Sequence, residues 1–150
     1  MIILLYGQPA SGKTTLAKEL MKIFKEENAI NIDGDKWRDV TKNKDYSKEG
    51  RYKNLKGAFD MAIYLEKDNY IPILSFVTPY DELRKYLYDN ATKLHEIHLF
   101  YNLEEDRGRN MNFAKDFEEP SHGRSYISLN TSTMNVDSAV SQIIKFITRK

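Results

Sequence analysis

Short apolar runs alternate with amphipathic segments along the whole chain. Runs rich in Ile, Leu, Val and aromatic residues predict buried strands over residues 1–6, 29–32, 71–77, 96–101 and 126–129. Apolar residues that recur every three or four positions predict helices over residues 13–27, 50–67, 79–90 and 136–147, whereas the polar residues 36–50 predict an irregular loop. Alternating strands and helices are typical of an α/β fold, in which a parallel sheet carries helices on both faces.

Glycine and polar residues follow the predicted strands and mark one edge of this sheet. They are Gly7, Asp33, Asp35, Thr78 and Asn102. Ligands of parallel sheets bind beyond the carboxyl ends of the strands. We therefore expect these residues to share one edge, with the charged stretch 103–118 lying over it.

Composition and charge narrow the classes of protein that remain. The 150 residues suit one compact domain, residues 1–150. Lys and Arg number 23 against 22 Asp and Glu, a balance that argues against nucleic-acid binding or a membrane-surface role. The absence of cysteine excludes a thiolate zinc site and a catalytic thiol, and no apolar stretch approaches membrane-spanning length. We expect a cytoplasmic protein without nucleic-acid or membrane partners.

Residues 7–15 read Gly-Gln-Pro-Ala-Ser-Gly-Lys-Thr-Thr and lie between the first predicted strand and the first predicted helix. This is the phosphate-binding pattern G-x-x-x-x-G-K-[ST] in the context that it requires. Its glycines let the backbone wrap an anion closely, Lys13 supplies a charge to the β- and γ-phosphates, and Thr14 supplies a hydroxyl to Mg²⁺. The pattern predicts a site for a nucleoside triphosphate and Mg²⁺. Its members are Gly7, Ala10, Ser11, Gly12, Lys13, Thr14 and Thr15.

A second pattern, Asp33-Gly34-Asp35 with Arg38 three residues on, follows the second predicted strand. Next to a triphosphate site, one carboxylate can hold a Mg²⁺-bound water and the other can accept a proton from an attacking hydroxyl. Arg38 can clamp an anionic acceptor. The competing interpretation is an ordinary Asp-Gly turn with a solvated arginine.

The phosphate loop followed by Asp-Gly-Asp-x-x-Arg resembles the adenylyl sulfate kinases, and the resemblance continues over nearly the whole chain. The further matching segments are Tyr46-Ser47, Arg51-x-x-Asn54, Phe76-Val77-Thr78-Pro79-Tyr80, Glu96-Ile97-His98, Asn102-Leu103-Glu104, Arg109-Asn110 and Leu129-Asn130-Thr131.

The resemblance implies a three-layer P-loop nucleotide-kinase fold with a five-stranded parallel sheet, and a Mg-ATP-dependent transfer to the 3′-hydroxyl of adenosine 5′-phosphosulfate. Asp35 would be the general base, with Lys13 on the ATP phosphates. Asp33 and Thr14 would hold the Mg²⁺ shell. The remaining implied contacts are Arg38, Arg51 and Asn54 on the acceptor's phosphate and sulfate, Tyr46 on its base, Thr78 beside it, and Arg109 on the adenine of ATP. The family also implies a homodimer.

From spacing alone, Arg51 and Asn54 also fit an ordinary polar helix face, and Tyr46 also fits an exposed aromatic residue. The lid region, about residues 103–120, is shorter than in the family, and Asn110 stands where the family has Asp. Phe113 or Phe117 would have to substitute for the family phenylalanine that covers the acceptor base.

Two other functions therefore stay open. One is a kinase of the same fold that acts on another nucleotide, such as a nucleoside diphosphoramidate or other pyrimidine nucleotide. The other is a non-catalytic ATP-binding partner module.

Overall fold

The computed structural model describes residues 1–105, 107 and 112–149. These residues form a five-stranded parallel sheet with the strand order β2-β3-β1-β4-β5. The strands are β1 (Ile2–Tyr6), β2 (Ala29–Asp33), β3 (Ile71–Ser75), β4 (Leu94–Phe100) and β5 (Tyr126–Asn130). The predicted α/β class is confirmed.

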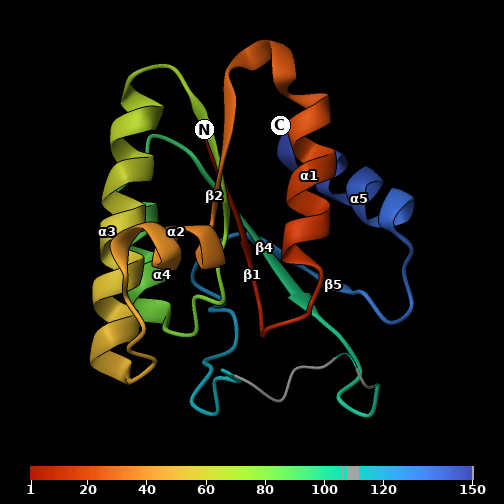
Figure 1. Ribbon diagram of the computed structural model, residues 1–150. Helices are drawn as coiled ribbons and strands as arrows, with labels where there is room; N and C mark the ends of the chain where they lie inside the picture. Colours follow the sequence, from red (N-terminus) through yellow and green to blue (C-terminus); the bar gives the residue numbers. More distant parts are fainter. Residues whose placement is uncertain (106, 108–111, 150) are drawn as a thin grey trace.

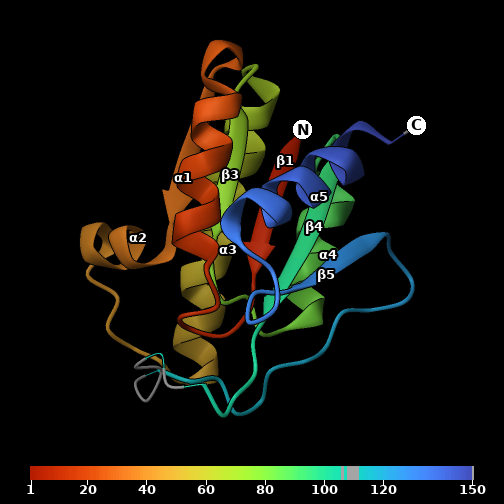
Figure 2. The same ribbon diagram turned by 90° about the vertical axis from the view of Figure 1, so that its right-hand side faces the viewer.

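Helices cover both faces of the sheet and complete three layers. Helices α1 (Lys13–Ile23) and α5 (Val136–Thr148) lie on one face, and α3 (Lys48–Lys67) and α4 (Asp81–Asn90) lie on the other (Figures 1 and 2). The short helix α2 (Gly34–Thr41) projects from the end of β2. In the described part of the chain, no helix is long and apolar enough to cross a membrane.

The central strand β1 joins the two cores. Its alternate residues Ile2, Leu4 and Tyr6 pack in the core on the α3 and α4 side, whereas Ile3 and Leu5 pack in the core on the α1 and α5 side. All five are fully buried, and burial of one such side chain stabilises the fold by roughly 1.5–3 kcal/mol. The loop that follows β1 is therefore anchored on the most buried strand of the sheet.

The expectation of an irregular loop over residues 36–50 was wrong in its first part. Asp33 is the N-cap of α2, and its carboxylate accepts hydrogen bonds from the backbone N–H groups of Asp35 and Lys36. Trp37 packs against the core and donates its indole N–H to the carbonyl of Asn54. A good cap and one aromatic anchor are enough to form a helix that polar composition does not predict.

The first predicted helix also ends earlier than expected. Helix α1 stops at Ile23, and the chain tightens into a 3₁₀ turn at Lys25–Glu27 before Asn28 takes a left-handed φ of 58°. Pro72 is the second residue of β3. The pairing of β3 with β1 begins only at Ile73, so the missing N–H of Pro72 costs no hydrogen bond to β1.

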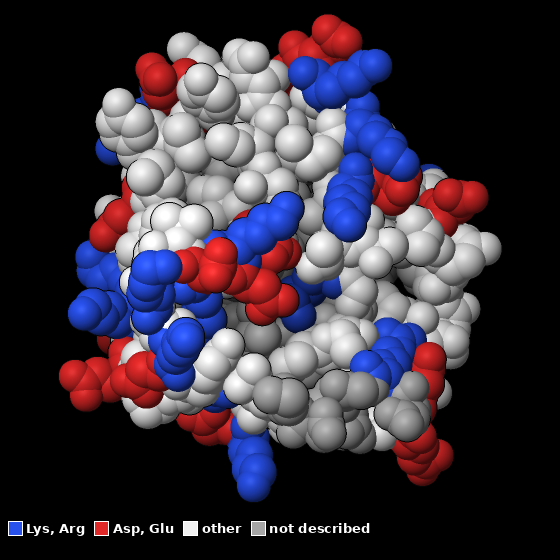
Figure 3. All heavy atoms as spheres, in the orientation of Figure 1, with Lys and Arg blue, Asp and Glu red and all other residues white. Residues whose placement is uncertain are grey.

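Neighbouring strands send their loops to opposite faces. β1 continues into α1 on one face, and the adjacent β3 continues toward α4 on the other. This divergence leaves a crevice beyond the carboxyl ends of the two strands, where ligands of such sheets bind. In the view of Figure 3, acidic and basic side chains border a hollow in the molecular surface.

Candidate active site

The loop between β1 and α1 requires glycine at both of its ends. Gly12, directly before α1, has a φ of 105°, in the left-handed region. Gly7 has a φ of 153°, and a Cβ atom there would overlap the carbonyl oxygen of Leu99. No side chain among the described residues caps α1. The first N–H groups of α1 are therefore available to an anion.

The side chain of Lys13, the first residue of α1, folds back onto the carbonyl groups of the loop. The Lys13 Nζ donates to the carbonyl oxygens of Gly7 at 2.9 Å and Gln8 at 2.7 Å. Burial lowers the pKa of Lys13 to about 7, and the nearby carboxylates of Asp35 and Asp33 oppose that shift. Negatively charged phosphate oxygens would be stronger partners for this ammonium than the neutral carbonyls that it contacts here.

Asp33 is buried at the end of β2 and accepts hydrogen bonds from several elements. Its Oδ1 accepts from the hydroxyls of Thr14 at 3.1 Å and Ser75 at 3.2 Å. Its Oδ2 accepts from the backbone N–H groups of Asp35 at 3.2 Å and Lys36 at 3.3 Å. Asp33 therefore joins the phosphate loop, β3 and α2 at one point.

Asp35 has different surroundings although it lies only two residues further along. It is exposed in the first turn of α2 and lines the cleft described next. Among the described residues, none donates a hydrogen bond to its carboxylate. Its oxygens are thus available to a ligand, whereas those of Asp33 are already occupied.

A cleft of about 430 Å³ opens beside the phosphate loop, in the crevice between the loops that follow β1 and β3. It brings together residues of the phosphate loop, both aspartates and all the residues predicted to bind the acceptor. The predicted site residues that line it are Ala10, Gly12, Lys13, Thr14, Thr15, Asp33, Asp35, Arg38, Tyr46, Arg51, Asn54 and Thr78. Gly7 and Ser11 lie in the same loop.

Arg38 and Tyr46 form one unit at the rim of the cleft. The guanidinium carbon of Arg38 lies 3.9 Å from the centre of the Tyr46 ring. The Arg38 Nη1 also donates to the backbone carbonyls of Asn43 at 3.1 Å and Asp45 at 3.2 Å. Burial lowers the pKa of Arg38 below its usual value. A base that stacks on Tyr46 would therefore meet a ring whose one face already carries a cation.

Arg51 and Asn54 lie one turn apart on α3, and both reach the cleft. The side-chain oxygen of Asn54 is buried and has no partner among the described residues. Arg51 donates to the carbonyl oxygen of Asn112 at 3.2 Å and lies 3.6 Å from a carboxylate oxygen of Asp116. Thr78 is fully buried after β3 with a φ of 48°.

Backbone groups at Ala114 and Glu118 hydrogen-bond the lid region to the rest of the protein. The Gln8 side chain donates to the carbonyl of Ala114 at 2.7 Å and accepts from its N–H at 2.9 Å. Four residues on, the N–H of Glu118 donates to the carbonyl of Pro79 at 2.7 Å. These hydrogen bonds fix the position of the segment between the two residues.

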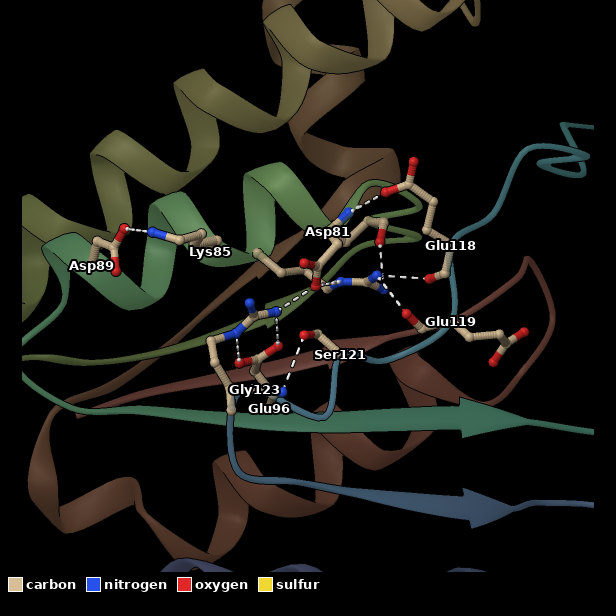
Figure 4. Close-up of polar contacts among 11 residues, drawn as sticks. Asp81, Lys85, Asp89, Glu96, Glu118, Glu119, Ser121 and Gly123 are labelled. Carbon is tan, nitrogen blue, oxygen red and sulfur yellow. Dashed lines mark hydrogen bonds and ion pairs between the residues drawn. The ribbon is translucent and has the colours of Figure 1, made fainter.

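Two arginines link the lid region and the residues that follow it to α4 and β4 (Figure 4). Arg84 is fully buried and donates to the carbonyls of Glu118 at 2.7 Å and Glu119 at 3.3 Å. Arg124 bridges the carboxylates of Glu96 at 2.7 Å and Asp81 at 2.6 Å. Asp81 of α4 is thus a partner of Arg124.

The two phenylalanines proposed to cover the acceptor base lie elsewhere. Phe113 and Phe117 line a second cavity of about 540 Å³, on the β4 and β5 side of the lid region. Phe117 stacks on Tyr6 and His98, with ring centres 6.4 Å and 5.8 Å apart. Among the lid residues that the structure describes, Asn112 lines the acceptor cleft.

Arg109, predicted to contact the adenine of ATP, lies outside the described residues. A residue that the sequence did not single out, Arg107, reaches the phosphate loop. It donates to the carbonyl of Ala10 at 3.1 Å and to the hydroxyl of Thr131 at 2.9 Å, and it lies 4.3 Å from the centre of the Tyr101 ring. Its only sequence signal was its place in the charged stretch after β4.

The strand order, the phosphate loop after the central strand and the aspartates after the edge strand define a P-loop nucleotide-kinase fold. More narrowly, the chain belongs to the adenylylsulphate kinase family, whose sequence model matches residues 1–114.

Individual relatives agree with this assignment. The adenylyl-sulfate kinase of Penicillium chrysogenum is 35% identical over 101 residues, which cover 65% of this chain and 46% of that protein. The probable adenylyl-sulfate kinase of Aeropyrum pernix is 31% identical over 112 residues, which cover 70% of this chain and 61% of that protein. The matched part is thus about half to three-fifths of the length of these relatives.

Solved structures show the same fold. The Mycobacterium tuberculosis APS kinase, solved in complex with AMPPNP and APS, superposes with a TM-score of 0.81 over 99% of this chain and 97% of that chain. At 16% sequence identity this likeness establishes the fold alone.

Proposed function

We propose that this chain is an ATP-dependent kinase of a nucleotide 3′-hydroxyl, and that its acceptor is adenosine 5′-phosphosulfate. One observation carries the proposal. A single cleft of about 430 Å³ is lined by part of the phosphate loop, by Asp33 and Asp35, and by the predicted acceptor-binding residues Arg38, Tyr46, Arg51, Asn54 and Thr78. The names of the relatives from Penicillium chrysogenum and Aeropyrum pernix support the same reaction.

The donor half of the site suits Mg-ATP. In this proposal the N–H groups of the phosphate loop and the start of α1 bind the phosphates, and Lys13 exchanges its loop carbonyls for β- and γ-phosphate oxygens. Thr14 and Asp33 are hard oxygen donors 3.1 Å apart, which is the ligand chemistry that Mg²⁺ prefers. When bound, Mg²⁺ would neutralise charge that develops on the phosphates.

The acceptor half of the site supplies the general base, Asp35. A bond forms between the acceptor's 3′-oxygen and the γ-phosphorus, and the bond from the γ-phosphorus to the β–γ bridging oxygen breaks. The bridging oxygen leaves with the electron pair as part of ADP. Asp35 accepts the hydroxyl proton, a role that its unoccupied carboxylate supports. Arg38, Arg51 and Asn54 would hold the anionic groups at the 5′ end of the acceptor.

A kinase of another nucleotide is the second candidate, and one observation favours it. The match to the family ends at residue 114, inside the lid region, and the aromatic residues after it do not line the acceptor cleft. Less of the acceptor base would then be covered than in a relative whose lid phenylalanine lies over it. Bases other than adenine would therefore be rejected less strongly.

The proposal is tested by ADP release, measured with ATP and a panel of acceptors that includes adenosine 5′-phosphosulfate, AMP, CMP and UMP. We expect adenosine 5′-phosphosulfate to give the highest kcat/KM, with release abolished in Lys13→Ala. A higher kcat/KM for a pyrimidine nucleotide would replace the first candidate by the second. Near-normal ADP release by folded Lys13→Ala protein would overturn both.

A further inference from the structure

Arg51, one of the residues predicted to bind the acceptor's phosphate and sulfate, already faces a carboxylate. Arg51 is largely buried in the cleft wall, with 12% of its side chain exposed. Its Nη1 lies 3.6 Å from Asp116, and its Nη2 donates to the carbonyl of Asn112 at 3.2 Å. An acceptor anion that binds Arg51 from the cleft therefore comes close to the Asp116 carboxylate.

Asp116 is held in this position. The hydroxyl of the buried Tyr80 donates to its other carboxylate oxygen at 2.9 Å. Two residues before it, both backbone groups of Ala114 are bound by Gln8, and two residues after it, Glu118 is bound by the buried Arg84. The backbone therefore cannot carry Asp116 away from Arg51 without losing several hydrogen bonds.

The contact between Arg51 and Asp116 contributes little to the stability of the fold. Half of the Asp116 side chain is exposed to solvent, and ion pairs of this kind are worth roughly 0–1 kcal/mol. Asp116 does not itself line the cleft, but a fixed carboxylate 3.6 Å from a cation of the cleft wall acts mainly on a ligand bound at that cation. It repels a doubly charged group about twice as strongly as a singly charged one.

We propose that Asp116 is a specificity-determining residue that disfavours acceptors whose terminal 5′ group is a dianion. This inference rests on the proposed function, because it assumes that the acceptor's terminal group lies at Arg51. A terminal sulfate carries one negative charge, whereas the terminal phosphate of ADP carries close to two near neutral pH. ADP is therefore the closest competitor in shape, and Asp116 acts against it by charge.

The test is the affinity of the acceptor cleft for adenosine 5′-phosphosulfate and for ADP. Protein saturated with AMPPNP, so that the donor site is filled and no turnover occurs, is titrated with each ligand by calorimetry. Asp116→Asn should tighten binding about threefold for adenosine 5′-phosphosulfate and about tenfold for ADP, because the effect scales with ligand charge. Tyr80→Phe, which releases the carboxylate, should shift both affinities in the same direction by less.

Asp89→Asn is the matched control. Asp89 lies near the far end of α4 in an exposed ion pair with Lys85 (Figure 4), and its replacement should leave both affinities unchanged.

An unchanged ratio of the two affinities in Asp116→Asn would overturn the inference, and the proposed function would stand if the wild-type protein still phosphorylates adenosine 5′-phosphosulfate. Absence of turnover alone would overturn only the proposed function, since the ratio needs no turnover. If neither ligand binds the AMPPNP-loaded wild-type protein, both fall.

Discussion

Asp33 and Asp35 are chemically identical and two residues apart, yet their surroundings differ. The oxygens of Asp33 accept four hydrogen bonds, two of which start helix α2. Asp35 lies one step into that helix with its carboxylate free of described partners and directed to the cleft. This difference supports a positioning role for Asp33 and a proton-accepting role for Asp35.

Replacement of each aspartate by asparagine separates the two roles. Asp35→Asn should lower kcat by about 10²–10⁴, the usual contribution of a positioned base, with little change in ATP binding. Asp33→Asn should weaken Mg-ATP binding while α2 still forms, because asparagine caps helices as well as aspartate does. Steady-state kinetics and ATP titrations measure both. Full kcat in Asp35→Asn with none in Asp33→Asn would show that the roles are reversed.

Lys13 gives the site a pH dependence. Because its pKa is about 7 in the free protein, Lys13 is largely a neutral amine above pH 7. Phosphates favour the charged form, so ATP binding should take up a proton there, and affinity should fall by up to about tenfold per pH unit above 7. Calorimetry in buffers of different ionisation enthalpy measures the uptake.

Lys13→Met is the control for this pH dependence. It removes the charge, so it should bind ATP weakly at all pH values and lose that part of the uptake. Equal proton uptake by the wild-type and Lys13→Met proteins at pH 8 would contradict the account.

At the scale of elements, the sequence predicted the strands and main helices because each has a strong apolar pattern. It missed α2, whose formation depends on the Asp33 cap and on Trp37 against α3. The strand order could not be read from periodicity, since a buried strand carries no mark of its neighbours. Motif residues were predictable because they directly follow strands.

Other contacts of the site could not be predicted. Arg107 joins a charged stretch without periodicity to the phosphate loop, and Asp116 joins it to helix α3, and both partners are distant in sequence.

The described residues of the lid region have no helix or strand, and buried charges fix the position of the segment that follows Ala114. Arg124→Ala should lower the free energy of unfolding by about 3 kcal/mol, because it leaves the buried Glu96 carboxylate without its partner. Lys85→Ala breaks a comparably short but exposed ion pair on α4, and it should cost less than about 0.5 kcal/mol. Urea denaturation compares the two. Equal losses would mean that the Arg124 bridge does not hold the segment.

At the scale of the whole molecule, the fold explains why donor and acceptor residues meet. The loops after β1 and β3 diverge to opposite faces, and the cleft between them takes the phosphate loop on one side and α2 and α3 on the other. The predicted homodimer and the extent of the domain over residues 1–150 stay predictions. Sedimentation would measure the first, and limited proteolysis the second.

The most direct measurement is the position of the new phosphate in the product. The protein is incubated with Mg-ATP and adenosine 5′-phosphosulfate, and the product is analysed by mass spectrometry and phosphorus NMR, with Lys13→Ala as the inactive control. The account predicts one product, phosphorylated on the 3′-hydroxyl, in equal amount to the ADP released. No 3′-phosphorylated product from adenosine 5′-phosphosulfate, alongside efficient turnover of a pyrimidine nucleotide, would contradict it.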